Sequence, residues 1–98
     1  MDRLQAMRVF ARVAELASFA RAADALDLSR ARVSEAVAAL ERNLGARLLH
    51  RTTRRVRLTQ DGAVFYERCK DLLADADEVE SMFRKSDEAL VGRIRVDM

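Results

Sequence analysis

The sequence has 98 residues, which is enough for one small domain, and half of them are hydrophobic while 35% are charged. It contains no apolar run near the roughly 18 residues of a membrane span and starts with MDRLQ rather than a signal peptide, so we expect a cytoplasmic protein without a membrane partner. Residues 1–57 carry twelve arginines against six acids, a net charge of +6, whereas residues 58–98 carry six bases against ten acids, a net charge of −4. This imbalance predicts a polyanionic partner for the first part only.

The first two predicted helices cover about residues 4–16 and 19–26. In the first, polar residues fall on one stripe and apolar residues fill the remainder, which predicts a mostly buried helix. Ser18 is a good N-cap for the second helix. Because that second helix is rich in alanine, another helix can approach it closely.

A third helix is predicted over about residues 30–44, after a short turn at Asp27 and Leu28. Ser29 is its expected N-cap and Gly45 its expected left-handed C-cap. Four apolar residues spaced by four, three and four positions should form its inner face: Val33, Val37, Leu40 and Leu44. Two helices joined by a short turn, the second capped by serine, are typical of a helix-turn-helix, here at about residues 19–38.

Two short strand-like segments follow, Leu48–Arg51 and Val56–Leu58, and they flank a basic tip at residues 52–55. This pattern predicts a two-stranded hairpin, or wing. Thr59 is then the expected cap of a fourth helix. The first domain should therefore span residues 1–59.

The fourth helix is predicted over about residues 60–88, within a linker segment at 60–90, and would be roughly 43 Å long. Its apolar residues follow a heptad spacing: Phe65, Cys69, Leu72, Ala76, Val79, Phe83 and Leu90. Because the small head should not cover so long a helix, we expect this seam to bind a second copy of the chain. The alternative is an ordinary helix that covers its own domain, which the length and register of the pattern disfavour. Residues 91–98 alternate like a strand, and we interpret them as the start of a further domain.

These residues together resemble the N-terminal DNA-binding domain of the LysR-type transcriptional regulators. The matching residues occur in order and cover nearly all of residues 1–90: Ser18-Phe19, Arg21-Ala22-Ala23, Leu26, Leu28-Ser29, Val33-Ser34, Leu40-Glu41, Leu44-Gly45, Leu48 to Arg54, Leu58-Thr59 and Gly62. The resemblance implies a mostly α-helical fold, in which a winged helix-turn-helix of three helices and a two-stranded wing precedes a long dimerisation helix.

The resemblance also implies a homodimer on an inverted-repeat operator in double-stranded DNA, with linker helices that pair roughly antiparallel. It leaves a tetramer open for the full-length protein, and it places the sensing of a small-molecule inducer in a C-terminal domain absent from these residues. Two departures lie on the reading helix. Arg30-Ala31 replaces a common Gln-Pro, and Glu35 stands where a basic residue is common. Both departures suggest that the operator bases differ from those of better-known members of the family.

The third helix is expected to enter the major groove while the wing contacts phosphates or the minor groove. The expected DNA-binding residues are Ser18, Ser29, Arg30, Ala31, Arg32, Ser34, Glu35, Ala38, Arg51, Thr52, Thr53, Arg54 and Arg55. Arg32 and Arg42 could also be simple surface charges. Glu35 either accepts a hydrogen bond from cytosine N4 or orients a neighbouring arginine.

Other function classes fit the sequence less well. It has one histidine (His50, read as structural or surface), one cysteine and no glycine-rich phosphate loop, so we expect no catalysis, no metal and no cofactor. A coiled-coil adaptor would leave the arginine-rich head without a role. A winged-helix regulator of another family would not explain the long heptad helix. Cys69 is expected to be a small buried residue, with a redox sensor as the alternative.

Overall fold

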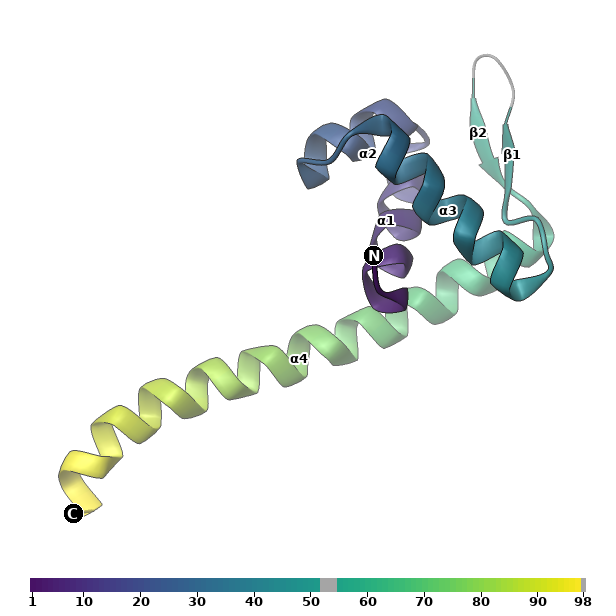
Figure 1. Cartoon of the computed structure of the whole chain (residues 1–98). Helices are drawn as coiled ribbons and strands as arrows, with labels where there is room; N and C mark the ends of the chain where they lie inside the picture. Colours follow the sequence, from purple (N-terminus) through teal and green to yellow (C-terminus); the bar gives the residue numbers. More distant parts are fainter. Residues whose placement is uncertain (52–54, 98) are drawn as a thin grey trace.

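The computed structural model describes the backbone of residues 1–51 and 55–97, and the side chains of residues 1–51 and 55–83. Three short helices and a two-stranded sheet form a head, from which one long helix projects (Figure 1). The elements in chain order are α1 (Arg3–Leu16), α2 (Phe19–Leu26), α3 (Arg30–Leu44), β1 (Leu49–Arg51), β2 (Val56–Leu58) and α4 (Gln60–Asp97). The mostly helical, winged helix-turn-helix architecture predicted from the sequence is confirmed.

Side-chain caps define where the head's helices begin. The Ser18 side chain accepts a hydrogen bond from the Arg21 backbone N–H at the start of α2, and Ser29 accepts one from Arg32 at the start of α3, each at 3.1 Å. Gly45 ends α3 in the left-handed conformation, with φ of 65°. Each of these caps satisfies backbone groups that a helix end leaves unpaired, and each was predicted.

The core of the head lies around α1, which touches every other helix. Phe10 and Val13 of α1 are fully buried, as are Val33 and Val37 of α3. The Phe10 ring packs against Phe65 of α4, with the ring centroids 5.4 Å apart. This contact fixes the first turns of α4 to the head.

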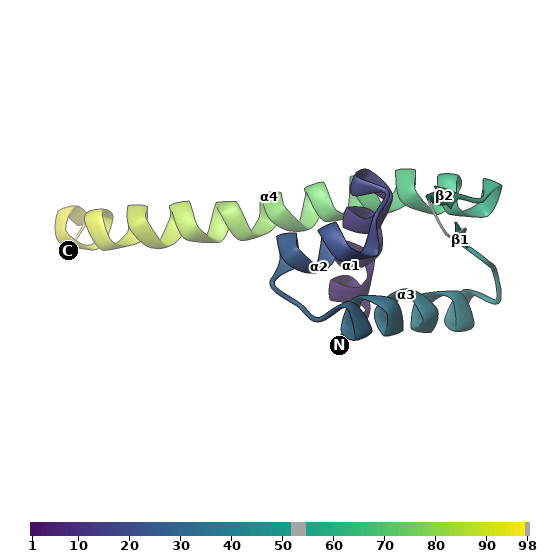
Figure 2. The same cartoon turned by 90° about the horizontal axis from the view of Figure 1, so that it is seen from above.

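A view from above shows α3 and α4 on opposite sides of the head, with α1 and α2 between them (Figure 2). The outer face of α3 therefore points away from the long helix. A partner can approach α3 without meeting α4.

The two strands pair antiparallel, with Leu49 opposite Leu58 and Arg51 opposite Val56. The wing joins α4 through Thr59, whose hydroxyl donates to the Arg47 carbonyl at 2.6 Å and accepts from the Gly62 backbone N–H at 2.8 Å. A Cβ at Gly62 would collide with the Leu48 carbonyl, so only glycine permits this close packing of α4 on the wing.

The helix α4 is longer than predicted, because it continues through Gly92 to Asp97 instead of ending near Glu88. The expectation of a strand over residues 91–98 is therefore wrong for residues 91–97, while Met98 lies outside the described residues. A helix satisfies its backbone hydrogen bonds within the segment, whereas a lone strand needs a neighbour. Over the described part of the chain, no helix has a stretch apolar and long enough to cross a bilayer.

Candidate nucleic-acid interface

The turn between α2 and α3 is tight and held by backbone hydrogen bonds. Asp27 adopts the left-handed conformation at φ of 57°, and the Leu28 N–H donates to the Ala23 carbonyl at 2.9 Å. Ala22 and Ala23 are buried, so α2 can lie close to its neighbours. Short side chains and one left-handed residue thus set the angle between the two helices of the motif.

The helix α3 has a buried inner face and an exposed outer face. Val33, Val37 and Leu40 are buried as predicted, and Ala36 joins them. The prediction for Leu44 is wrong, because this side chain is 48% exposed. Its spacing places Leu44 on the inner side of the helix, but it is the last residue before the Gly45 cap and remains exposed there.

The predicted reading residues divide into two groups by exposure. Arg30, Ala31 and Glu35 are exposed, while Ser34 and Ala38 are half-buried. Ala31, Ser34, Glu35 and Ala38 lie on or beside the outer face, away from the buried valines, and the structure brings these four onto one side of the head. Arg30 is exposed because it is the first residue of α3, although its spacing from Val33 places it nearer the inner side.

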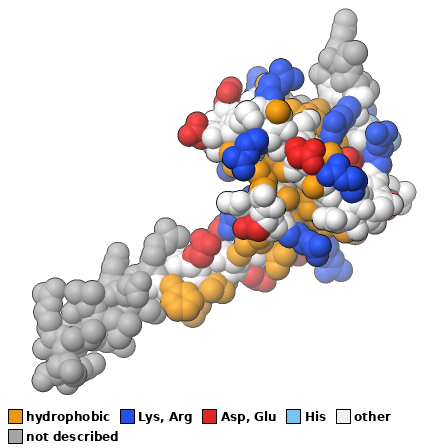
Figure 3. Space-filling model, viewed as in Figure 1, with side chains coloured by type: hydrophobic (Ala, Val, Ile, Leu, Met, Phe, Trp, Pro, Cys, Tyr) orange, Lys and Arg blue, Asp and Glu red, His pale blue; other side chains and the backbone are white. Residues whose placement is uncertain are grey.

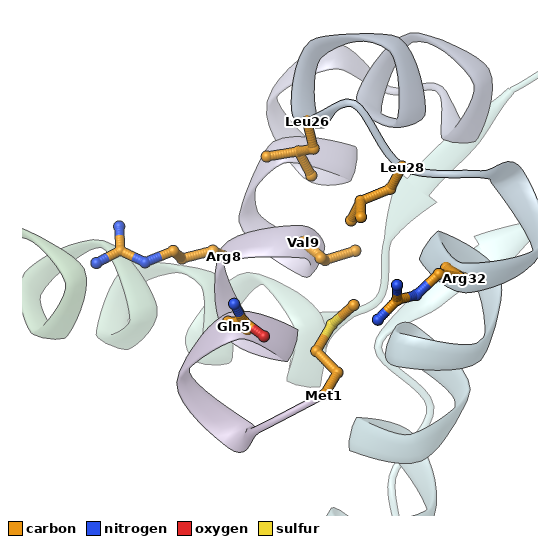
Figure 4. Close-up of a pocket in the computed structure, with 7 residues that line it drawn as sticks. All are labelled: Met1, Gln5, Arg8, Val9, Leu26, Leu28 and Arg32. Atoms are coloured by element: carbon orange, nitrogen blue, oxygen red, sulfur yellow. The ribbon is translucent and has the colours of Figure 1, made fainter.

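Arg32 is exposed but takes a different direction from this group. It lines a pocket of about 310 Å³ between α1 and the start of α3, and its guanidinium points toward Met1 (Figure 4). Gln5, Val9 and Leu28 line the same pocket. Arg32 thus flanks the outer face of α3 instead of standing on it.

The two serine caps have a further chemical capacity. Each hydroxyl oxygen of Ser18 and Ser29 accepts a backbone hydrogen bond, which leaves its hydrogen available to donate. Both lie at helix N-termini, where the helix dipole favours an anion. They are suited to phosphate oxygens.

In the wing, Arg51 already has partners within the protein. Its guanidinium lies 3.9 Å from a carboxylate oxygen of Glu41 and 4.7 Å from the centre of the Phe19 ring. Glu41 also accepts hydrogen bonds from the Leu48 and Leu49 backbone N–H groups, at 2.8 and 3.4 Å. Arg51, the last residue of β1 before the wing tip, thus links the wing to α2 and α3.

Of the other four residues predicted to contact DNA from the wing, the structure describes only one. Arg55 is exposed beside β2. Thr52, Thr53 and Arg54 lie outside the described residues.

An ion pair on the outer face of α3 was not predicted from the sequence. Arg42 Nη2 donates to Glu35 Oε1 at 2.8 Å, and the two side chains are 64% and 67% exposed. The residues are seven positions apart, so they lie on the same side of the helix two turns from each other. That spacing, with alanine at 38 and 39 between them, was the available sequence signal.

The space-filling view looks onto the α3 side of the head. Lys and Arg side chains are spread over this side, with fewer acidic groups among them (Figure 3). This distribution agrees with the net charge of +6 over residues 1–57, which include α1, α2, α3 and β1. The surface around α3 is suited to a polyanion.

The predicted seam of α4 has two different environments. Phe65 and Cys69 are covered by the head, so the expectation that nothing in the same chain meets the seam is wrong for this part. Leu72, Val79 and Phe83 are 46%, 51% and 68% exposed. Ala76 between them is half-buried, and the side chain of Leu90 lies outside the described ones. The uncovered seam therefore begins at Leu72.

Cys69 has the chemistry of a core residue. Its side chain is 2% exposed, and burial raises the pKa of the thiol from 9.0 to about 11. The reactive thiolate is therefore scarce at neutral pH. His50 is exposed on β1, and the described residues contain no group of three potential metal ligands.

Residues 4–63 match the family model of the bacterial regulatory helix-turn-helix proteins of the lysR family. The chain belongs to this family. A Pseudomonas aeruginosa HTH-type transcriptional repressor is 50% identical over 97 residues, covering 99% of this chain and 31% of that protein. The uncharacterized Escherichia coli regulator YhjC is 45% identical over 98 residues, covering all of this chain and 33% of that protein. Both of these relatives of the LysR-family chain are named as transcriptional regulators.

Solved structures of LysR-type DNA-binding domains have the same fold. The BenM DNA-binding domain in a complex with catB site 1 DNA superposes with a TM-score of 0.80 at 36% identity, covering 87% of this chain and 93% of that one. The CbnR DNA-binding domain in its DNA complex gives 0.79 at 31% identity, covering 88% and 98%. The chain spans about a third of the length of the curated relatives it matches.

Proposed function

We propose that this LysR-family chain binds double-stranded DNA in a sequence-specific manner, as a homodimer on an inverted-repeat operator, in the bacterial cytoplasm. The observation that carries the proposal is the outer face of α3, which is exposed on the side of the head opposite α4. An α-helix fits the major groove, and arginine on such a face can bind guanine edges or phosphates. The solved complexes of two related domains with DNA support DNA as the partner.

The residues divide between reading and anchoring. Residues of α3 meet base edges: Arg30, Ala31, Ser34, Glu35 and Ala38. An arginine of the wing tip can also enter the minor groove. Residues at helix starts and in the wing bind phosphates: Ser18, Ser29, Arg32, Thr52, Thr53, Arg54 and Arg55. Arg51 supports the wing through Glu41 and Phe19 and adds its remaining donors to this group.

The homodimer forms through the exposed seam of α4. Leu72, Val79 and Phe83 are uncovered in a single chain, and burying such side chains against a second copy removes them from water. Ala76 and Leu90 continue this seam. Phe65 and Cys69 support it indirectly by fixing α4 to the head. Two heads related by a two-fold axis then present two copies of α3 to inverted half-sites.

The boundary between the head and the dimerisation segment follows the elements, while α4 itself continues beyond residue 90 to Asp97. Residues 1–59 form the DNA-binding head, residues 60–90 form the dimerisation helix, and a small-molecule inducer acts through a further domain in longer relatives of this chain. A protein that contains these units regulates transcription. In its full-length form, two dimers can assemble into a tetramer. No metal or cofactor takes part in DNA binding.

The test is selection of bound fragments from random duplex DNA, followed by titration of the selected duplex by fluorescence anisotropy. We expect an inverted-repeat sequence, and an affinity that falls steeply with salt because bound phosphates release counterions. With about six phosphate contacts, the loss is about a thousandfold between about 50 and 200 mM salt. A chain that selects no sequence and binds no duplex at moderate salt would instead fit a protein-binding adaptor.

A further inference from the structure

The Glu35–Arg42 ion pair is the feature of the reading face that the proposed function leaves unexplained. A carboxylate among phosphates is repelled, so an acid on this face must have a compensating partner. Here the partner is Arg42, at 2.8 Å. The pair contributes no net charge, so it adds little to general attraction for DNA.

The geometry of the pair leaves hydrogen-bonding groups free. Arg42 uses Nη2 for Glu35, and a guanidinium has five N–H donors in a planar fork. Glu35 accepts through Oε1, and a carboxylate has about four acceptor positions. Each residue can therefore bind a base edge while the ion pair stays intact.

The combination matches one base pair in the major groove. Guanine presents two acceptors there, N7 and O6, and cytosine presents the N4 donor beside them. An arginine fork held next to a carboxylate presents donors beside an acceptor, in the complementary order. An A·T pair keeps the N7 acceptor but presents the adenine N6 donor in place of guanine O6 and the thymine O4 acceptor in place of cytosine N4, so the arginine and the carboxylate cannot both be satisfied.

We infer that Glu35 and Arg42 act as one unit that reads a G·C base pair, with Arg42 donating to guanine and Glu35 accepting from cytosine N4. This inference rests on the proposed function, because it requires α3 to lie in the major groove. It assigns a specificity-determining role to Arg42, and it gives Glu35 both of the roles that the sequence left as alternatives.

The test compares sequence selection by the wild-type chain and by Glu35→Gln, with Glu67→Gln as the matched control. Glu67 is the acid of another exposed ion pair, with Lys70 at 3.2 Å on α4, so the control removes the same charge away from α3. We expect the wild type and the control to select one fixed G·C pair in each half-site. Glu35→Gln should accept other pairs at that position, since glutamine can also bind adenine.

Titrations then quantify the discrimination. Replacing the selected G·C pair by A·T should weaken wild-type binding roughly 10- to 100-fold and Glu35→Gln binding less than about threefold. Arg42→Met should lose the same discrimination, and the double variant should lose no more than either single one, because the residues act together. Both side chains are exposed, so thermal unfolding of the variants should match that of the wild type.

The outcomes separate this inference from the proposed function. If the wild type selects no sequence, both are overturned. If the wild type is specific but Glu35→Gln keeps the same base preference, the proposed function stands and the inference is overturned. If Glu35→Gln binds every duplex more tightly with unchanged preferences, Glu35 only repels phosphate, and the inference is again overturned.

Discussion

The helices α3 and α4 pack on the same core from opposite sides, yet the faces that they leave uncovered have different chemistry. The uncovered face of α3 carries arginine, glutamate and small residues such as Ala31. The uncovered seam of α4 carries Leu72, Val79 and Phe83. Their inner faces are alike, since both are apolar. These two faces fit the two partners that we propose, a polyanion for α3 and an apolar surface for α4.

The shared core gives the largest expected effect. Phe10 is fully buried and packs on Phe65, so both helices depend on it. Phe10→Ala should lower the free energy of unfolding by about 3–5 kcal/mol through lost burial and a cavity. Urea unfolding followed by circular dichroism, at matched protein concentration, measures the change. Val64→Ala, at a side chain that is 63% exposed, should change it by less than about 0.5 kcal/mol. Equal effects would show that Phe10 does not anchor the core.

Charges on the seam of α4 should separate the two chains without unfolding the head. The double variant Leu72→Glu with Val79→Glu should be monomeric in sedimentation, because unpaired carboxylates would be buried at the interface. Its operator affinity should fall about 100-fold as the linkage between half-sites is lost. Val64→Glu introduces a charge at an exposed apolar position off the seam, and it should remain dimeric. Dimers of the double variant would show that the seam lies elsewhere.

A single change on α3 should weaken DNA binding without changing dimerisation, unlike the charges on the seam, which should affect both. Arg30 is exposed in the first turn of α3. Arg30→Ala should weaken operator binding about tenfold while sedimentation and thermal unfolding stay as in the wild type. Arg68→Ala, an exposed arginine of α4, is the control and should bind within about twofold of the wild type. Equal losses in both variants would indicate general electrostatic attraction without a reading face.

The smallest expected effect concerns Cys69, at the point where α4 leaves the core. Burial raises the pKa of its thiol to about 11, above the value of 9.0 for a free thiol. The folded state therefore favours the protonated form. Its contribution to stability is complete below about pH 9 and is lost as the pH rises toward 11. Unfolding free energies from pH 8 to 11 should fall more steeply for the wild type than for Cys69→Ala.

Thiol labelling checks the same burial independently. Iodoacetamide should modify the folded wild type at pH 8 far more slowly than the urea-unfolded chain, because the thiolate is scarce and covered. Rapid labelling of the folded protein would place Cys69 at an accessible surface, and its proposed place in the core would then be wrong.

Local signals in the sequence predicted the head well, because they act through neighbouring residues. Ser18, Ser29 and Gly45 mark helix ends through hydrogen bonds within a few residues. Helical spacing identified Val33 and Val37 as buried. These features depend on backbone chemistry and periodicity, so they did not require knowledge of the tertiary arrangement.

The features that were missed depend on contacts between distant parts of the chain. Phe65 and Cys69 have the spacing of a dimer seam and equally the spacing of a helix packed on its own domain, and only the contact with Phe10 decides between these. Leu44 lies on the correct side of α3, but its exposure depends on its position at the end of the helix. The Arg42 partnership requires two side chains to span two turns, beyond the usual spacing of three or four residues.

The most direct test of the central claim is protection of guanine N7 from methylation on a selected operator, since N7 lies in the major groove. The outer face of α3 should protect two symmetry-related groups of guanines, and Arg30→Ala should weaken protection in both groups while leaving the dimer intact. Stable binding to the operator with every major-groove N7 still reactive would contradict the placement of α3 against the base pairs.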